Sequence, residues 1–365
     1  MLKILSQIHQ RFRAYNLLLQ QLTDTFTSIG KFRTKPRIYN LGSCFEMDDL
    51  IIHKAEELSD EKFLDLSRLS DTKQFRSALK NILIPRVVGT SGHKQVRDYI
   101  RNSLEKLDWD VRIDKFHDTV PIKGKLHFHN IIATLNPQAE RYLVLACHYD
   151  SKYMPDYEFL GATDSAVPCA MLVNLAQVLH EQLKPFRHLN STLSLMLLFF
   201  DGEEAFKEWN ATDSIYGARH LAKKWHGENF LDKIDILVLL DLIGAPDPKF
   251  YSFFSNTEAW YSRLIGIEER LANAGLLERY TSSGVARQLP NQYFLPNALL
   301  NYVEDDHIPF MKHDVPILHL IPMPFPSVWH TKDDNASVVD YITTENLSKI
   351  IRLFTMEYLL SYKPK

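Results

Sequence analysis

The chain contains several short apolar runs that are separated by longer segments of mixed polarity. The runs have the length of strands and cover Val111–Val120, Asn130–Leu135, Tyr142–Cys147, Leu193–Phe200, Ile236–Leu240 and Ile317–Ile321. The last four are nearly continuous in Leu, Val, Ile and Phe, a pattern that is typical of strands buried on both faces. We therefore expect a sheet whose central strands are covered on each side.

Segments with helical spacing of apolar residues lie between and after these runs. Helices are expected near Lys94–Leu107, Asp164–Leu183, Ser214–Trp225, Asn256–Leu276 and Thr344–Tyr362. The second should be amphipathic, capped by Asp and Ser, with Pro168 in its first turn where a missing N–H is tolerated. The alternation predicts an α/β fold, a three-layer sandwich with a central mixed, mostly parallel twisted sheet and helices on both faces.

The N-terminal part of the chain differs in composition from the rest. Residues 1–36 carry six Lys or Arg residues against the single acid Asp24. Without a compact apolar stretch and a small-residue cleavage site, this balance favours a mitochondrial targeting segment over secretion. A basic helix packed on the domain fits it equally well. Residues 37–69 are interpreted as a linker or peripheral segment, acidic and irregular from Asp48 to Ser70, and residues 70–365 as the main domain.

Composition and charge narrow the classes of partner. The chain has 365 residues, of which 45% are hydrophobic and 24% charged, as in ordinary globular proteins. A net charge of −3 gives no electrostatic reason to expect nucleic acid. The charge-free apolar run Leu193–Phe200 is far shorter than the roughly 20 apolar residues that cross a bilayer. We therefore expect no transmembrane span. We also expect a monomer, because the sequence shows no evident coiled coil or interface.

Acidic and histidine residues gather at the ends of the expected strands. Asp164, Glu204 and His330 are the donor types that bind zinc, and three protein ligands leave a fourth position for substrate or water. Glu203, beside Glu204, could then act as a base. His148, Asp241 and His319 also lie near strand ends, where ligands bind in open α/β sheets. The pattern therefore predicts one site.

Each of these residues also has a purely structural interpretation. Asp164 could be a helix N-cap, and Glu203-Glu204 could be a solvated turn. His319 could be a satisfied core histidine, and Trp209 and Trp329 could serve packing alone. The coincidence of the polar residues at strand ends favours the functional reading.

Several motifs in the chain resemble those of one enzyme family. They are Ala-Cys-His-Tyr-Asp-Ser-Lys-Tyr (146–153), Gly-Ala-Thr-Asp-Ser-Ala-Val-Pro-Cys-Ala (161–170), Phe-Phe-Asp-Gly-Glu-Glu-Ala-Phe (199–206), Leu-Leu-Asp-Leu-Ile-Gly-Ala-Pro (239–246), Asp-Asp-His-Ile-Pro-Phe (305–310) and Pro-Phe-Pro-Ser-Val-Trp-His-Thr (324–331). Over residues 70 to 362 the chain resembles animal glutaminyl-peptide cyclotransferases. The resemblance does not cover residues 1 to about 60.

The resemblance implies a fold related to zinc aminopeptidases and a single zinc ion held by Asp164, Glu204 and His330. The implied enzyme is an acyltransferase that closes the N-terminal glutamine of a peptide to pyroglutamate with release of ammonia, and N-terminal glutamate is a second implied substrate. Glu203 would take a proton from the attacking amine and return it to the leaving group. Asp241 and Asp305 would share a hydrogen bond, with one of them protonated.

Around this centre the resemblance implies a small substrate pocket. Its apolar walls would be Trp209, Phe325 and Trp329, with His319 and Lys152 nearby. Cys147 and Cys169 occupy positions that are bridged by a disulfide in secreted relatives. The chain departs from the family at Glu304, where glutamine is usual, and in the dissimilar stretch 281–303 that should border the pocket.

Two other functions fit part of the pattern. An aminopeptidase with two zinc ions would use a His-X-Asp element, here His148 to Asp150, with Asp164, Glu204, Asp241 and His330. The count of zinc ions per chain would separate it from a cyclase. A catalytically silent protein that binds peptide N-termini is the third reading, although all proposed ligands and the base are retained.

Overall fold

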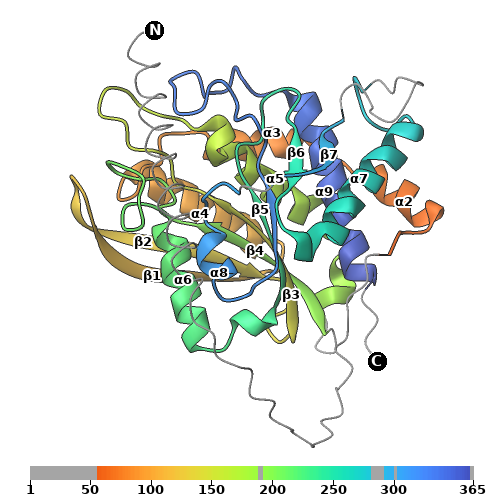
Figure 1. Ribbon diagram of the computed structural model, residues 1–365, viewed down its shortest axis with the longest axis horizontal. Coiled ribbons are helices and arrows are strands. Elements are labelled where there is room, and N and C mark those ends of the chain that lie inside the picture. The colour runs from red at the N-terminus through yellow and green to blue at the C-terminus, as the bar shows by residue number, and fades with distance from the viewer. Residues whose placement is uncertain (1–55, 188–191, 281–291, 300–301, 362–365) are drawn as a thin grey trace, which may run out of the picture. The chain divides into compact units, whose positions relative to one another are not determined.

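The computed structural model describes residues 56–187, 192–280, 292–299 and 302–361, and these residues build a six-stranded sheet in the order β1-β2-β4-β3-β5-β8. The strands are β1 (Asp110–Val120), β2 (Gly124–Thr134), β3 (Arg141–His148), β4 (Leu193–Phe200), β5 (Ile234–Leu240) and β8 (Ile317–Leu320). β1–β2 and β2–β4 are antiparallel, whereas β4–β3, β3–β5 and β5–β8 are parallel (Figure 1). The predicted mixed, mostly parallel sheet is confirmed, and every apolar run contributes a strand.

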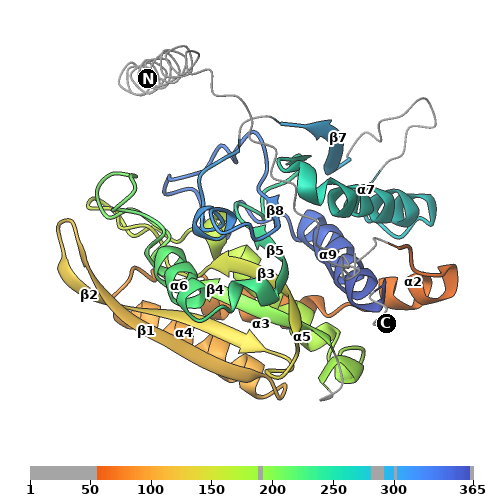
Figure 2. The same cartoon turned by 60° about the horizontal axis from the view of Figure 1, so that its bottom comes forward.

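The period-two alternation of side chains divides the buried residues of the central strands between two cores. On β3, Leu143 and Leu145 join the larger core, while Val144 and Ala146 point to the opposite face. The larger core is covered by α2 (Asp60–Ser67), α3 (Thr72–Ile82), α4 (Ser91–Glu105), α5 (Val167–Val178), α7 (Glu258–Asn273) and α9 (Tyr341–Ser361), and the other by α6 (Tyr216–Gly227) and α8 (Ile308–Met311). Figure 2 shows α4 and α6 on opposite sides of the sheet, so the three-layer prediction is confirmed.

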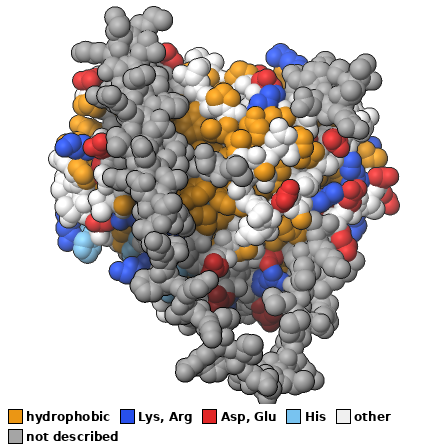
Figure 3. Space-filling view, in the orientation of Figure 1, with side chains coloured by type: hydrophobic (Ala, Val, Ile, Leu, Met, Phe, Trp, Pro, Cys, Tyr) orange, Lys and Arg blue, Asp and Glu red, His pale blue; other side chains and the backbone are white. Residues whose placement is uncertain are grey.

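A small second sheet pairs β6 (Phe250–Ser252) with β7 (Phe294–Ala298) in parallel. On the face drawn in Figure 3, hydrophobic side chains gather in the middle, and acidic and basic side chains are interspersed toward the edges. Among the described residues, none of the helices combines the length and the apolarity that crossing a bilayer requires.

The helix that follows Asp164 differs from its prediction. α5 begins at Val167, and every residue from Val167 to Ala176 is buried, because the helix is packed between the sheet and its neighbours α3 and α9. It is therefore not amphipathic. Asp164 has the non-helical angles φ −117° and ψ 77° in an irregular turn, and α5 has no side-chain N-cap. The N-cap interpretation of Asp164 is wrong.

The acidic segment before residue 70 is more regular than predicted. α2 occupies Asp60–Ser67, and Ser59 and the acidic residues of its first turn suit a helix N-terminus. Phe63 is buried in the larger core, and the Leu58 N–H donates to the Glu357 carboxylate on α9 at 2.9 Å. The irregular reading is thus wrong for this stretch. The predicted targeting segment and Cys44 lie outside the described residues.

Candidate metal centre and catalytic site

Asp164, Glu204 and His330 come together although they are far apart in the sequence. Their ligand atoms all lie within 4.8 Å of one another. His330 Nε2 is 3.3 Å from Asp164 Oδ2 and 3.5 Å from Glu204 Oε1, and neither of these buried carboxylate oxygens has a hydrogen-bond partner. Buried carboxylate oxygens without a hydrogen bond are costly, so a cation fits this position, and the donor set suits zinc.

The charges of this group act on one another. Burial disfavours a charged imidazole, but the carboxylates of Glu204 and Asp164 raise the pKa of His330 to about 9. Burial likewise opposes ionisation of Asp164, yet His148 and His330 hold its pKa well below its ordinary range. A cation bound here would replace the proton of His330 as the partner of both carboxylates.

Arg86 fixes the turn that carries Asp164. Its guanidinium is fully buried and donates to the carbonyls of Tyr149 and Gly161, each at 2.9 Å, and to that of Asp164 at 3.2 Å. It also donates to the Leu160 carbonyl. The sequence reasoning missed this residue. The available signal was a single charged residue within the apolar stretch from Ile82 to Val88.

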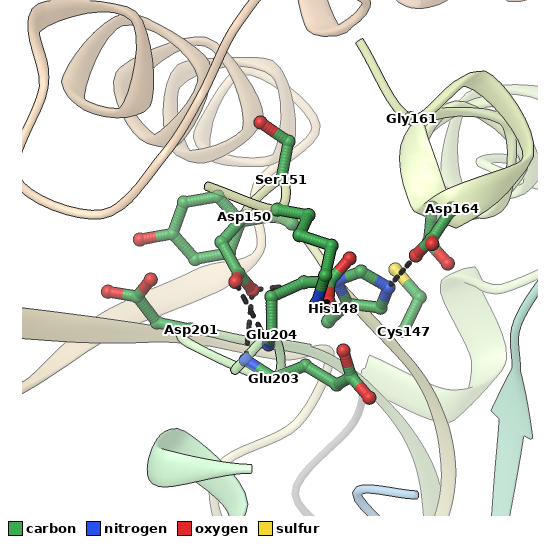
Figure 4. Close-up of polar contacts among 12 residues, drawn as sticks. Cys147, His148, Asp150, Ser151, Gly161, Asp164, Asp201, Glu203 and Glu204 are labelled. Carbon is green, nitrogen blue, oxygen red and sulfur yellow. Dashed lines mark hydrogen bonds and ion pairs between the residues drawn. The ribbon is translucent and has the colours of Figure 1, made fainter. Parts of the chain in front are cut away.

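The Glu203-Glu204 turn is buried and not solvated. Asp150 accepts hydrogen bonds from the backbone N–H groups of Glu203 at 3.1 Å and of Glu204 at 3.3 Å, as Figure 4 shows. Gly202 has φ +70°, and a Cβ at this position would lie 2.4 Å from the ring of Phe128. The turn therefore requires glycine, and the solvated-turn interpretation is wrong.

Glu203 has the environment expected of a proton-transfer group. Its side chain is buried beside the metal-ligand candidate Glu204. Burial raises its pKa well above the ordinary value, and Glu204, Asp305 and Asp306 add to the rise while His148 opposes it. A carboxyl group with a raised pKa can both accept and return a proton near neutrality.

Asp241 and Asp305 belong to the acidic groups around this centre, and each has a further polar partner. Asp241 accepts from the Ser165 hydroxyl, while Asp305 Oδ2 is 2.7 Å from His319 Nε2. Burial raises the pKa of Asp241 to about 6, with His148 opposing and Asp305 adding to the rise. For Asp305, burial is outweighed by His319, so its pKa is lowered. His319 is itself buried.

A second group of possible metal ligands shares Asp164 with the first. It comprises His148, Asp164 and Asp241, with His148 Nε2 at 3.0 Å from Asp164 Oδ1 and 3.5 Å from Asp241 Oδ1. Asp164 thus lies between two sets of ligands, as a bridging residue would. Asp150, the other member of the two-zinc pattern, is engaged by the Glu203 and Glu204 amides.

The predicted substrate residues fall into two places. Phe325 and Trp329 meet edge to face at 4.9 Å, and Trp329 stacks on His330 at 4.1 Å, so this aromatic wall adjoins the candidate metal. Trp209 Nε1 donates to Glu304 Oε2 at 3.1 Å over a separate cavity between α6 and α8. Lys152 Nζ lies 2.8 Å from Glu204 Oε2, so it contacts a ligand candidate directly.

The two buried cysteines are neighbours. Cys147 Sγ and Cys169 Sγ are 3.2 Å apart, as two thiols, and the Cys169 thiol donates to the His148 carbonyl. The pair joins the end of β3 to α5 at the edge of the site.

Comparison with known proteins agrees with this geometry. Residues 130–355 match the peptidase family M28. The chain is 68% identical over 332 residues to a glutaminyl-peptide cyclotransferase of Drosophila melanogaster, covering 90% of this chain and 93% of that one. It is 46% identical over 307 residues to the glutaminyl-peptide cyclotransferase of Bos taurus, covering 80% and 83%.

A solved structure gives the same picture. The crystal structure of Macrostomum lignano glutaminyl cyclase superposes with a TM-score of 0.76 at 39% identity, covering 85% of this chain and 96% of that one. The fold and the metal-ligand cluster define a member of the M28 family of zinc peptidases and their relatives. Within that family, the chain belongs to the glutaminyl-peptide cyclotransferases.

Proposed function

We propose that this chain is a zinc-dependent acyltransferase that converts the N-terminal glutamine of peptides or proteins to pyroglutamate and releases ammonia. One zinc ion per chain is held by Asp164, Glu204 and His330. The observation that carries the proposal is the adjacency of this cluster, whose carboxylate oxygens include two without a hydrogen bond, to the buried carboxyl of Glu203. Membership of the cyclotransferases supports the choice of substrate.

The reaction forms a bond between the α-nitrogen and the γ-carbonyl carbon and breaks the bond from that carbon to the amide nitrogen. Bound zinc supplies Lewis-acid polarisation of the γ-carbonyl oxygen. Glu203 accepts the proton that the α-amine loses on attack, and it returns that proton to the departing nitrogen, which leaves as ammonia. Glu203 takes up one proton and returns it in the same reaction, so a single carboxyl with a raised pKa is enough for both transfers.

Asp241 and Asp305 complete the set of acidic groups. With its pKa at about 6, Asp241 can offer either a proton or an acceptor to a nitrogen of the substrate. Asp305 is held ionised by His319 and so favours the proton-bearing form of nearby groups, Glu203 among them. We assign both to orienting the reacting nitrogens.

The remaining assignments concern substrate binding. Phe325 and Trp329 form the apolar wall for the methylenes of the glutamine side chain. His319 acts through Asp305, and Lys152 acts through Glu204, so both position other groups. Trp209 and Glu304 bind the part of the peptide that lies farther from the metal.

A dinuclear aminopeptidase is the second candidate, and the His148, Asp164 and Asp241 group favours it. Against it stands Asp150, whose carboxylate already holds two backbone amides. The test is to incubate purified protein with a glutamine-initiated dipeptide amide. We expect ammonia, a cyclised product and one zinc per chain. Free amino acids with two zinc ions would replace the cyclase by the aminopeptidase, and zinc binding without any product would favour a silent binding protein.

We also propose a cellular location and a redox state for the cysteine pair. We propose a mitochondrial location, with the secretory pathway as the alternative, and a monomeric enzyme that is independent of nucleic acid. The Cys147–Cys169 disulfide is the form expected in an oxidising compartment, since the two thiols are adjacent. Microscopy of a fluorescent fusion and thiol labelling of the purified protein would test both points.

A further inference from the structure

A basic groove runs between α6 and α8 on the side of the sheet opposite the larger core. It has a volume of about 380 Å³, and its walls come from both helices and the segments that precede them. At one end of the groove Trp209 and Glu304, which precede the first turns of the two helices, are joined by a hydrogen bond. At the other end the rings of His226 and His313 stack at 4.0 Å.

The two ends define the direction and reach of the groove. α6 and α8 run in the same direction along it, since Trp209 and Glu304 precede the helices and His226 and His313 lie at or just beyond their ends. Ten residues of α6 correspond to about 15 Å. An extended peptide advances about 3.3 Å per residue, so roughly four to five residues fit.

The groove carries an excess of positive charge. Arg219, Lys223 and Lys312 line it together with the two imidazoles, against the single carboxylate of Glu304. The indole of Trp209 already donates to that carboxylate. Among the described residues, no carboxylate lies within 4.0 Å of the amino group of Lys223 or Lys312, and both side chains are exposed. Their charges are available to a ligand.

The groove adjoins the catalytic centre through two backbone connections. The N–H of Ile215, which lines the groove, donates to the Glu203 carbonyl at 2.8 Å. Glu304 is followed in the chain by Asp305, which is bonded to His319. A peptide whose first residue lies at the metal would therefore pass the Trp209–Glu304 pair and continue between the helices.

We propose that the α6–α8 groove binds the substrate segment that follows the N-terminal glutamine and favours peptides with Asp or Glu at about the third to sixth positions. This inference rests on the proposed cyclase function and specifies its substrate class. Ile215, Ala222 and Ile308 also line the groove, and their apolar side chains suit the methylenes of a peptide.

The test compares two glutamine-initiated hexapeptide amides that differ only in three Glu or three Lys residues at positions four to six. At low salt we expect kcat/KM to favour the acidic peptide by about 5- to 10-fold, as several exposed ion pairs would give. The preference should shrink at 1 M salt, where the screening length is about 3 Å. Equal kcat/KM values for the two peptides would overturn the proposal.

A double variant, Lys223→Glu with Lys312→Glu, should abolish or invert the preference. Because both peptides are measured on the same variant, a general loss of activity cancels in the ratio. The matched control is Lys73→Glu with Lys80→Glu, which makes the same charge change at exposed positions on α3. It should keep the wild-type ratio. An unchanged ratio in the groove variant, or equal effects of the two double variants, would contradict the groove.

A binding measurement separates this proposal from the cyclase assignment. The probe is a fluorescent pyroglutamate-initiated peptide with three Glu residues, followed by anisotropy on the zinc-loaded protein. We expect it to bind more weakly to the groove variant than to the control. If the wild type cyclises no glutamine peptide but the probe still binds more weakly to the groove variant than to the control, only the cyclase function is overturned. Equal binding to both variants would overturn the groove.

Discussion

The buried guanidinium of Arg86 donates a hydrogen bond of 3.2 Å to the backbone carbonyl of Asp164. Because the same group also holds the carbonyls of Tyr149 and Gly161, one side chain secures both the end of β3 and the turn of a metal-ligand candidate. Arg86 is thus a positioning residue that touches no substrate.

Replacing Arg86 should weaken both the fold and the metal site. Arg86→Lys keeps the charge but cannot reach all of these carbonyls, and buried acceptors left without donors cost about 1–3 kcal/mol each. We expect unfolding to become easier by at least about 3 kcal/mol, and zinc affinity to fall about 10- to 100-fold. Urea unfolding and chelator competition measure the two effects. Arg101→Lys, at a solvent-facing position on α4, should change neither.

Glu203→Gln should abolish ammonia release while zinc stays bound. The amide has nearly the shape of the carboxyl but cannot take up the proton of the attacking amine. Loss of about 100- to 10,000-fold in kcat is expected from removal of a general base. Glu208→Gln, an exposed change on the same loop, serves as control. Near-normal turnover by Glu203→Gln would refute its role as the base.

Glu204→Gln tests the metal assignment separately. Because this change removes the charge of a proposed ligand, zinc content should drop together with activity. Treatment of the wild type with a chelator should also abolish activity and lower the melting temperature, since metal binding stabilises the folded state. Titration of zinc into the stripped protein should restore activity at one ion per chain. A requirement for two ions would favour the dinuclear site.

Gly202→Ala should disrupt the turn that presents Glu203 and Glu204. The new methyl group would lie 2.4 Å from the Phe128 ring, and φ is +70°. We expect a cost of about 1–3 kcal/mol and a lower kcat. Gly227→Ala is the matched control, because no atom lies within 4 Å of the position where its Cβ would stand. Equal stability of the two variants would argue against a strained turn.

Glu268 should make the stability of the fold depend on pH. Its carboxylate accepts from the N–H groups of Tyr293 and Phe294 and from the Tyr280 hydroxyl, yet burial raises its pKa from 4.5 to about 7. Because this pKa is raised in the folded state, the contribution of Glu268 to the free energy of unfolding is complete below pH 4.5 and is lost as pH rises through about 7. The shift corresponds to about 3 kcal/mol.

Unfolding of wild type and Glu268→Gln across pH 4 to 8 measures this term. The variant has no titrating group at this position. The difference in the free energy of unfolding between variant and wild type should therefore change by about 3 kcal/mol over this pH range. A difference that is constant with pH would show that burial does not shift the pKa of the Glu268 carboxyl.

The sequence predicted the sheet well because each central strand is buried on both faces and leaves an uninterrupted apolar signature. α5 was misjudged for a related reason. It was expected to be amphipathic, but the helix lies inside its layer and all residues from Val167 to Ala176 are buried. α2 was missed because its N-terminal acidic residues, which favour a helix start, suggested irregular chain.

For the site, the donor types at strand ends indicated which residues would meet, as Asp164, Glu204 and His330 do. The sequence could not indicate the partners of those residues. Asp241 accepts a hydrogen bond from Ser165, and Asp305 pairs with His319, and neither partner was predicted from the sequence. Arg86 belongs to no catalytic motif. It acts by donating hydrogen bonds to backbone carbonyls, and no sequence pattern marks those contacts.

The stacking of Trp329 on His330 links the aromatic wall to the candidate metal ligand. A peptide that orders the indole ring also restricts the imidazole beside it, and an ion that fixes the imidazole restricts the indole. Linkage then requires that substrate and ion raise each other's affinity by the same factor. We therefore expect a resting enzyme to lose its ion more readily than one saturated with peptide.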